Sequence, residues 1–256
     1  MVHGNPTWSI YYRNLINLLK PNHRCIVPDH IGCGLSDKPG ATEYSFTLQE
    51  RIQDLTSLLD HLNIHNNITL IVHDWGGMIG MAYASMHPDA IKKMVILNTA
   101  AFHLPKPKKF PAILRFFRTS IGKYLILRHN LFAWGASQVS CSKTRMPRAL
   151  RKAYCAPYNT SHNRLATLKF VQDIPISKGD VSYDLISQIE NNLALLRDKP
   201  TLICWGMKDF IFDEHFLKVW ESRFPEAEVH RFPDGGHYIL EDYRDKICEL
   251  TSRFLS

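Results

Sequence analysis

The 256-residue chain lacks an uninterrupted apolar segment long enough to span a bilayer, which argues against an integral membrane protein. Its first residues form neither a basic leader nor an apolar stretch, so we expect no signal peptide and a cytoplasmic location. The six cysteines have no paired spacing, and without a signal peptide we expect them to be reduced rather than bridged. Repeats and low-complexity segments are absent too. We therefore expect one globular unit, for which an apolar content of 45% supplies a sizeable core.

Acidic residues are absent from residues 101–170, which contain fourteen Lys or Arg. The remainder carries seventeen basic and twenty-four acidic residues, so the net charge of +7 hides a strongly basic segment beside an acidic remainder. Between residues 110 and 134, bulky apolar side chains are interspersed with basic ones. Such a segment can lie peripherally on an anionic membrane surface or bind an acidic protein partner; alternatively, its apolar residues line a pocket while its arginines face water. No nucleic-acid motif accompanies it, so we expect no nucleic-acid partner.

Metal-binding and phosphate-binding patterns are also missing. His61 and His65 have helical i, i+4 spacing, but no carboxylate or thiolate cluster joins them. Gly32-Cys33-Gly34 lacks the third glycine and the lysine of phosphate-binding loops and is expected to be a tight turn. We therefore expect neither a metal nor a cofactor.

Strands and helices alternate along most of the chain. The expected strands are residues 24–28, 69–72, 93–97, 201–205 and 228–232, and the expected helices are residues 48–62, 77–87 and 241–254. This alternation predicts an α/β fold with a mostly parallel sheet and helices on both faces. It stops between residue 97 and about residue 190, where helices and loops dominate. We expect residues 1–100 and 191–256 to form two parts of one core and residues 101–190 to form an inserted helical cap.

An aspartate, Asp74, stands at the predicted turn between a strand and a helix, within the sequence Ile-Val-His-Asp-Trp-Gly-Gly of residues 71–77. In such an elbow the side chain projects from a strained turn, and the next backbone N–H is free to bind an anion. Most enzymes of similar layout carry a serine there. A carboxylate suits attack at a saturated carbon, which gives an alkyl ester that water must then cleave.

Asp209 and His237 follow Asp74 in the order nucleophile, acid, histidine that this architecture requires. Asp209 comes just beyond a buried strand and a Gly turn, and His237 lies in a turn-rich loop after the last strand. We predict that Asp74 attacks, His237 draws a proton from water, and Asp209 holds the imidazole tautomer. Asp213, four residues beyond Asp209, is the alternative acid.

Hydrogen-bond donors for a leaving group are predicted at Asn5 and Trp75. The segment His3-Gly4-Asn5-Pro6 resembles a His-Gly loop that helps to form an oxyanion hole. The side-chain amide of Asn5, with the backbone and indole N–H groups of Trp75, could hold a departing halide or carboxylate. In the alternative interpretation, Asn5-Pro6 is only a turn and Trp75 only packs.

These motifs carry a resemblance along nearly the whole chain. Residues 3–7, 28–39, 73–77 and 236–237 resemble the haloalkane dehalogenase branch of the α/β-hydrolase superfamily. Within that branch the chain is most similar to the β-lactone decarboxylases of long-chain olefin biosynthesis, through residues 8–13, 29–34, 98–102 and 205–210. The resemblance implies an α/β-hydrolase fold with an inserted cap, a hydrophobic small-molecule substrate, and release of carbon dioxide from a β-lactone to leave an alkene.

Other reactions use the same triad. A haloalkane dehalogenase would attack a carbon that bears a halogen, and an epoxide hydrolase would need two cap tyrosines. The tyrosines available by type are Tyr124, Tyr154, Tyr158 and Tyr183. A non-catalytic ligand-binding or scaffold member of the fold is the alternative of a different class.

Two departures from the family pattern bear on these expectations. Some dehalogenases carry their acid after the strand that here ends near Asn98, which cannot act as a carboxylate, so the resemblance selects Asp209. The family also normally has further strands upstream of His3, and here the N-terminal strands are missing. We expect an unpaired sheet edge that invites association, and lower stability than that of a version extended upstream.

Overall fold

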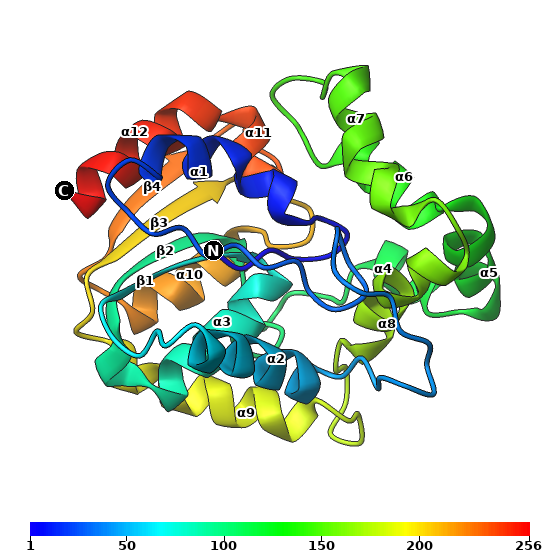
Figure 1. Cartoon of the computed structure of the whole chain (residues 1–256), viewed down its shortest axis with the longest axis horizontal. Coiled ribbons are helices and arrows are strands. Elements are labelled where there is room, and N and C mark those ends of the chain that lie inside the picture. The colour runs from blue at the N-terminus through cyan, green and yellow to red at the C-terminus, as the bar shows by residue number, and fades with distance from the viewer.

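A computed structural model of the chain describes residues 1–256 and contains a four-stranded sheet at its centre (Figure 1). The strands are β1 (Ile68–Asp74), β2 (Ile91–Thr99), β3 (Thr201–Gly206) and β4 (Glu228–Phe232). They lie in the order β1-β2-β3-β4, and every neighbouring pair is parallel. The expected α/β fold with a parallel sheet is therefore confirmed. Because all four strands run the same way, the loops that follow them meet at one edge of the sheet.

Alternate residues of the strands face two separate hydrophobic clusters. Leu70 and Val72 of β1 belong to one cluster, and Ile71 between them belongs to the other. The same alternation holds in β3, where Ile203 and Leu202 face opposite sides. Strands buried on both faces read as nearly continuous apolar runs, which is why the sequence showed them clearly.

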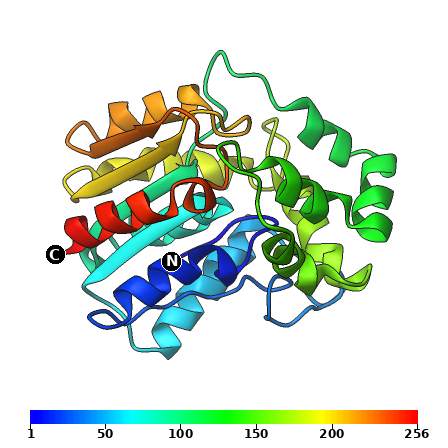
Figure 2. The same ribbon diagram turned by 90° about the horizontal axis from the view of Figure 1, so that it is seen from above.

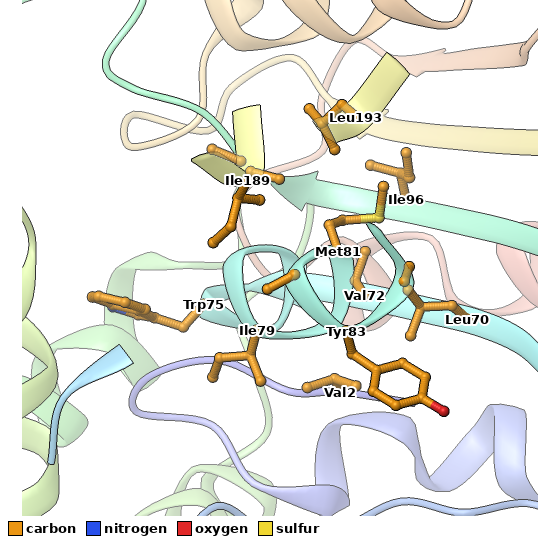
Figure 3. Packing of buried hydrophobic residues seen from close by; sticks show 14 of the residues in the cluster. Val2, Leu70, Val72, Trp75, Ile79, Met81, Tyr83, Ile96, Ile189 and Leu193 are labelled. Atoms are coloured by element: carbon orange, nitrogen blue, oxygen red, sulfur yellow. The ribbon is translucent and has the colours of Figure 1, made fainter. Parts of the chain in front are cut away.

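Helices cover both faces of the sheet (Figures 1 and 2). One cluster joins the sheet to α2 (Leu48–His61), α3 (Trp75–Met86), α9 (Tyr183–Asn192) and α10 (Glu214–Arg223). The other joins it to α1 (Arg13–Leu19), α11 (Ile239–Asp242) and α12 (Arg244–Leu255). Figure 3 shows Met81 of α3 close to Val72 and Ile96 of the sheet.

The helices predicted at residues 48–62 and 77–87 are present. Thr47 caps α2 by accepting the backbone N–H of Glu50, a common start signal for a helix. The single helix expected at residues 241–254 is instead two helices, α11 and α12. The chain breaks at Tyr243, whose φ of −131° lies outside the helical region.

The predicted strand at residues 24–28 is wrong. The segment pairs with no strand, and the amino group of Met1 donates a hydrogen bond to the carbonyl of Ile26. Val2 lies between this segment and β1, since its N–H donates to Ile71 and its carbonyl accepts the N–H of His73. The apolar pattern of residues 24–28 reflects the partial burial of residues 25–28 beside Met1 and Val2, but these two residues do not pair with the segment as a strand.

Between β2 and α9 the chain forms five helices and no strand. They are α4 (Ala112–Phe117), α5 (Ser120–His129), α6 (Leu131–Val139), α7 (Arg148–Cys155) and α8 (Leu165–Asp173). Single 3-10 turns occur at Ser9–Tyr12, Pro88–Ala90, Ala156–Tyr158, His162–Arg164 and Leu193–Leu196. In both overall views these five helices lie together beyond one end of the strands (Figures 1 and 2). Measured by length and apolar character together, every helix falls short of a membrane span.

Candidate active site

The turn from β1 into α3 holds Asp74 in a strained conformation. Its φ of 52° and ψ of −127° lie in a region that L-residues seldom adopt. Glycines in the first turn of α3 allow other segments to approach its backbone closely. A Cβ at Gly76 would lie only 1.9 Å from the carbonyl oxygen of Val2. At Gly77 it would lie 1.9 Å from the Thr99 hydroxyl. The Trp-Gly-Gly motif therefore lets α3 start against both the N-terminal segment and the end of β2.

The three predicted triad residues meet at the carboxyl edge of the sheet. His237 Nδ1 lies 2.8 Å from Asp209 Oδ2, and His237 Nε2 lies 3.7 Å from Asp74 Oδ2. Their exposed fractions are only 8% for Asp74, 2% for Asp209 and 6% for His237. The imidazole packs between the rings of His73 and Phe212, whose centroids lie 4.7 and 5.8 Å away. Two carboxylates thus flank one histidine in a largely dry site.

Asp209 is held by donors on both of its oxygens. The backbone N–H groups of Ile211 and Phe212 donate to Oδ1 at 2.7 and 3.1 Å. The Asn98 amide donates to Oδ2 at 3.1 Å, while Asn98 Oδ1 accepts the N–H of Gly206. A carboxylate so satisfied is fixed in position.

Asn98 therefore has a place in the site that the sequence reasoning missed. Its side chain bridges β2, β3 and the loop that carries Asp209. Its positive φ of 28° is the kind of signal that only the structure reveals. The alternative acid, Asp213, lies elsewhere: it caps α10 and pairs with Lys108 at 2.6 Å.

The charges of this cluster shift each other's protonation. Burial by itself would lower the pKa of His237, but the Asp209 carboxylate and then Asp74 raise it overall. Burial raises the pKa of Asp74, and His237 with the N–H groups of Asn5 and Trp75 opposes that rise. An imidazolium between two carboxylates is the arrangement that these neighbours favour.

The predicted leaving-group donors, Asn5 and Trp75, line a cavity next to Asp74, but the Asn5 amide differs from the prediction in its hydrogen-bond partner. The backbone N–H of Asn5 donates to Asp74 Oδ1 at 2.6 Å. The side-chain amide of Asn5 donates to the carbonyl of Thr167 in α8, and its oxygen is buried without a partner. Trp75, at the start of α3, lies at the edge of the group of side chains drawn in Figure 3, and the centroid of its indole lies 5.3 Å from that of the Phe170 ring.

A cavity of about 390 Å³ opens directly onto Asp74 and His237. Twenty-one of its thirty lining residues are hydrophobic. Its polar lining is limited to Asn5, Asp74, His103, Ser140 and His237. A cavity of this size and character suits an apolar small molecule, with few groups available to orient it.

No tyrosine lines this cavity. Tyr154 donates to Glu241, and Tyr158 is buried with its hydroxyl donating to the carbonyl of Thr7. The paired ring-protonating tyrosines of an epoxide hydrolase are therefore not found beside Asp74.

Known proteins resemble this chain along its whole length or nearly so. The sequence model of the family described as alpha/beta hydrolase fold matches residues 1–242. A cis-3-alkyl-4-alkyloxetan-2-one decarboxylase of Shewanella oneidensis is 54% identical, over 100% of this chain and 81% of that protein. One of Xanthomonas campestris with the same description is 45% identical, over 100% and 87%. A solved haloalkane dehalogenase from Bradyrhizobium elkani superposes with a TM-score of 0.85 at 27% identity, covering 99% of this chain and 88% of that one.

Proposed function

The chain belongs to the α/β-hydrolase fold family, in its haloalkane dehalogenase-like branch, and we propose that it is an enzyme that decarboxylates cis-3,4-dialkyl β-lactones to alkenes. The single observation that carries this function is the 54% identity to a decarboxylase of such oxetan-2-ones across the entire chain. The apolar cavity over Asp74 supports it, because the substrate is a four-membered ring with two alkyl groups. We assign catalysis to Asp74, Asp209 and His237.

In the first step Asp74 Oδ2 attacks C4 of the lactone, the saturated ring carbon that bears the ring oxygen. The C4–O bond breaks, and its electron pair stays on the oxygen, which becomes part of a free carboxylate. The substrate is then joined to Asp74 by an alkyl ester. Because the N–H of Asn5 holds Oδ1 at 2.6 Å, Oδ2 is the oxygen left to attack. Trp75 and Asn5 both line the cavity, and we assign to the new carboxylate the indole N–H of Trp75 and the Asn5 amide hydrogen that Thr167 does not accept.

In the second step the bond between C3 and the carboxylate carbon breaks. Its electron pair forms the C3–C4 double bond while the C4–O bond to Asp74 breaks, which releases carbon dioxide and regenerates the aspartate. Atoms and electrons balance without water or a redox partner. Inversion at C4 followed by anti elimination converts a cis-lactone into a cis-alkene. The negative charge passes from the substrate carboxylate to Asp74, where the Asn5 N–H and His237 lie close to it. The apolar cavity favours this step, because it solvates the substrate's carboxylate poorly and the neutral carbon dioxide and alkene well.

His237 then has a different task from the one predicted on the hydrolytic route. Decarboxylation needs no base to activate water, whereas Asp74 must leave as a carboxylate. An imidazolium 3.7 Å from Asp74 Oδ2 would stabilise that departing charge. The raised pKa of His237, caused by Asp209 and Asp74 against the effect of burial, supports this role.

We also propose the division of the chain into a core and a helical cap, with α4 to α8 as the part of the cap that covers the cavity. The outer surface of this cap carries unpaired basic residues, so the partner that it suits is anionic. Haloalkane hydrolysis is the second candidate reaction, favoured by the similarity to solved dehalogenases. It would use the same attack on carbon, followed by water.

A substrate panel tests the proposal. The purified protein is given a cis-3,4-dialkyl β-lactone, a 1-haloalkane and a terminal epoxide in separate reactions, and products are identified by mass spectrometry. We expect cis-alkene and carbon dioxide from the lactone at a rate far above those of the other two. Halide release from the haloalkane, with no alkene from the lactone, would replace the proposal with the second candidate. Asp74→Ala serves as the inactive control in every reaction.

A further inference from the structure

Five exposed hydrophobic residues surround the opening of the cavity. They line it and yet are 38 to 56% exposed: Leu104, Ile113, Phe116, Val139 and Phe210. We call these five residues the rim. They come from α4, α6 and the loops beside them. The apolar lining of the cavity therefore continues outward onto the surface of the protein, instead of ending at a polar edge.

Further exposed hydrophobic residues lie on α6 and on α5, the helix between α4 and α6 in the chain. Ile121 and Tyr124 of α5 are 66% and 56% exposed, and Trp134 of α6 is 53% exposed. Exposed apolar residues gathered on helices that contact one another, as α5 contacts α4 and α6, are typical of a binding surface for a protein or a membrane.

The surface around the rim is basic and is not neutralised within the protein. Of the fourteen Lys and Arg in residues 101–170, only Lys108 pairs with a carboxylate, that of Asp213. Arg115 stands between Ile113 and Phe116 of the rim and is exposed without an ion-pair partner. Three lysines are likewise exposed and without an ion-pair partner: Lys106 and Lys109 in the loop before α4, and Lys123 on α5.

We propose that helices α4 to α6 dock on an anionic lipid bilayer, with the rim inserted so that the cavity opens into the acyl chains. Bulky apolar residues flanked by Lys and Arg are the composition that binds the interface of an anionic membrane. Each basic residue near such a surface strengthens binding about fivefold. The absence of acidic residues over seventy positions removes the repulsion that would oppose this contact.

A bilayer fits these observations better than an acidic protein. The exposed apolar side chains are spread over three short helices, and the opening they surround leads to the reacting carboxylate. A lactone with two alkyl chains and its alkene product both partition into lipid, so an opening at the membrane spares them a passage through water. This reason rests on the proposed function; the binding itself does not.

Co-sedimentation with vesicles of equimolar phosphatidylglycerol and phosphatidylcholine tests the proposal without any substrate. At an ionic strength of about 0.01 M the Debye length is ~30 Å, so charges on the protein and the membrane are only weakly screened. Under these conditions we expect the protein to sediment with these vesicles. We expect it to stay in solution with pure phosphatidylcholine or at ~1 M salt. A failure of lactone decarboxylation would leave this result untouched, so the two proposals fail separately.

A charge-reversal variant and a matched control locate the contact. The cap variant reverses four basic residues: Lys106→Glu, Lys109→Glu, Arg115→Glu and Lys123→Glu. The control reverses four exposed, unpaired residues of the core: Lys20→Glu, Arg24→Glu, Lys92→Glu and Arg197→Glu. Both lose the same charge, but we expect vesicle affinity to fall at least ~100-fold in the cap variant and less than ~5-fold in the control.

Trp134 reports which face enters the lipid, because it is the most exposed of the five tryptophans. Brominated acyl chains should quench its fluorescence when vesicles are added, and Trp134→Phe should remove that quenching. The proposal is overturned if the parent protein does not sediment with anionic vesicles at low salt. It is also overturned if the two charge variants lose binding equally. Either outcome would assign the basic surface to an acidic protein instead.

Discussion

Replacing Asp209 with Asn should nearly abolish alkene formation while leaving the fold intact. The substitution keeps the shape of the side chain but removes the charge that lies 2.8 Å from His237 Nδ1. With an effective dielectric constant of about 20, that charge attracts an imidazolium by about 6 kcal/mol. Without it, burial should bring the pKa of His237 below its ordinary range, since Asp209 is the main group that raises it. We expect a loss of at least ~10³-fold in kcat.

A second substitution turns this into a test of charge rather than of shape. Asn98 Nδ2 lies 3.1 Å from the Asp209 oxygen that contacts His237. In Asp209→Asn/Asn98→Asp, the carboxylate is moved to position 98, at most ~6 Å from His237 Nδ1, where about 3 kcal/mol of the attraction remains. We therefore expect the double variant to recover about 100-fold of the lost kcat.

The assay is steady-state release of the alkene from a cis-β-lactone, measured by gas chromatography, with circular dichroism as a check on folding. The pH dependence of kcat is recorded for all three proteins, because a purely structural role for Asp209 would leave it unchanged. A folded Asp209→Asn variant that retains more than about a tenth of the parent rate would refute the proposed role of the Asp209 charge. So would a double variant that is no faster than Asp209→Asn.

The remaining predictions concern stability and pH. A methyl group at Gly77 would lie 1.9 Å from the Thr99 hydroxyl, so Gly77→Ala should lower the free energy of unfolding by about 3 kcal/mol in thermal melts. Gly179→Ala, where nothing lies within 4 Å, should change it by less than ~1 kcal/mol, and equal losses would contradict the packing argument. The raised pKa of His237 should stabilise the fold fully below about pH 6.5 and lose that contribution as pH rises through the higher folded value. Urea unfolding of the parent and of His237→Gln should therefore converge with rising pH. If the imidazolium is required, kcat should fall over the same range, whereas a histidine that activates water would make kcat rise with pH.

Much of the core was predictable because its signals are local. The β1–α3 turn combines a buried apolar run, an aspartate and two glycines in consecutive sequence. The two glycines are required by the close approach of other residues at Gly76 and Gly77. Strands buried on both faces gave three of the five expected ranges, and the fourth, residues 228–232, is the mostly half-buried β4. The fifth, residues 24–28, failed because an apolar pattern reports burial, while strand formation depends on neighbours that are distant in sequence.

Contacts between distant segments could not be predicted in the same way. Nothing near Asn98 in the sequence indicates that its amide meets Asp209, because the contact joins the ends of two parallel strands. Likewise, the Asn5 amide was predicted to point toward a leaving group, yet it donates to the carbonyl of Thr167 in α8. The break at Tyr243 also escaped the helical pattern. For Asn98 and Asn5, a contact with a segment distant in sequence decides which group the side-chain amide meets.

Alkene release by Asp74→Ala is the decisive measurement for attack of Asp74 on the substrate carbon. We expect this variant, folded and with His237 and Asp209 intact, to release no alkene from a cis-β-lactone above the uncatalysed background. Acid-quenched samples of the parent taken during a single turnover should carry the mass of one lactone on the peptide that contains Asp74. Turnover by Asp74→Ala within tenfold of the parent rate would show that Asp74 is not the nucleophile.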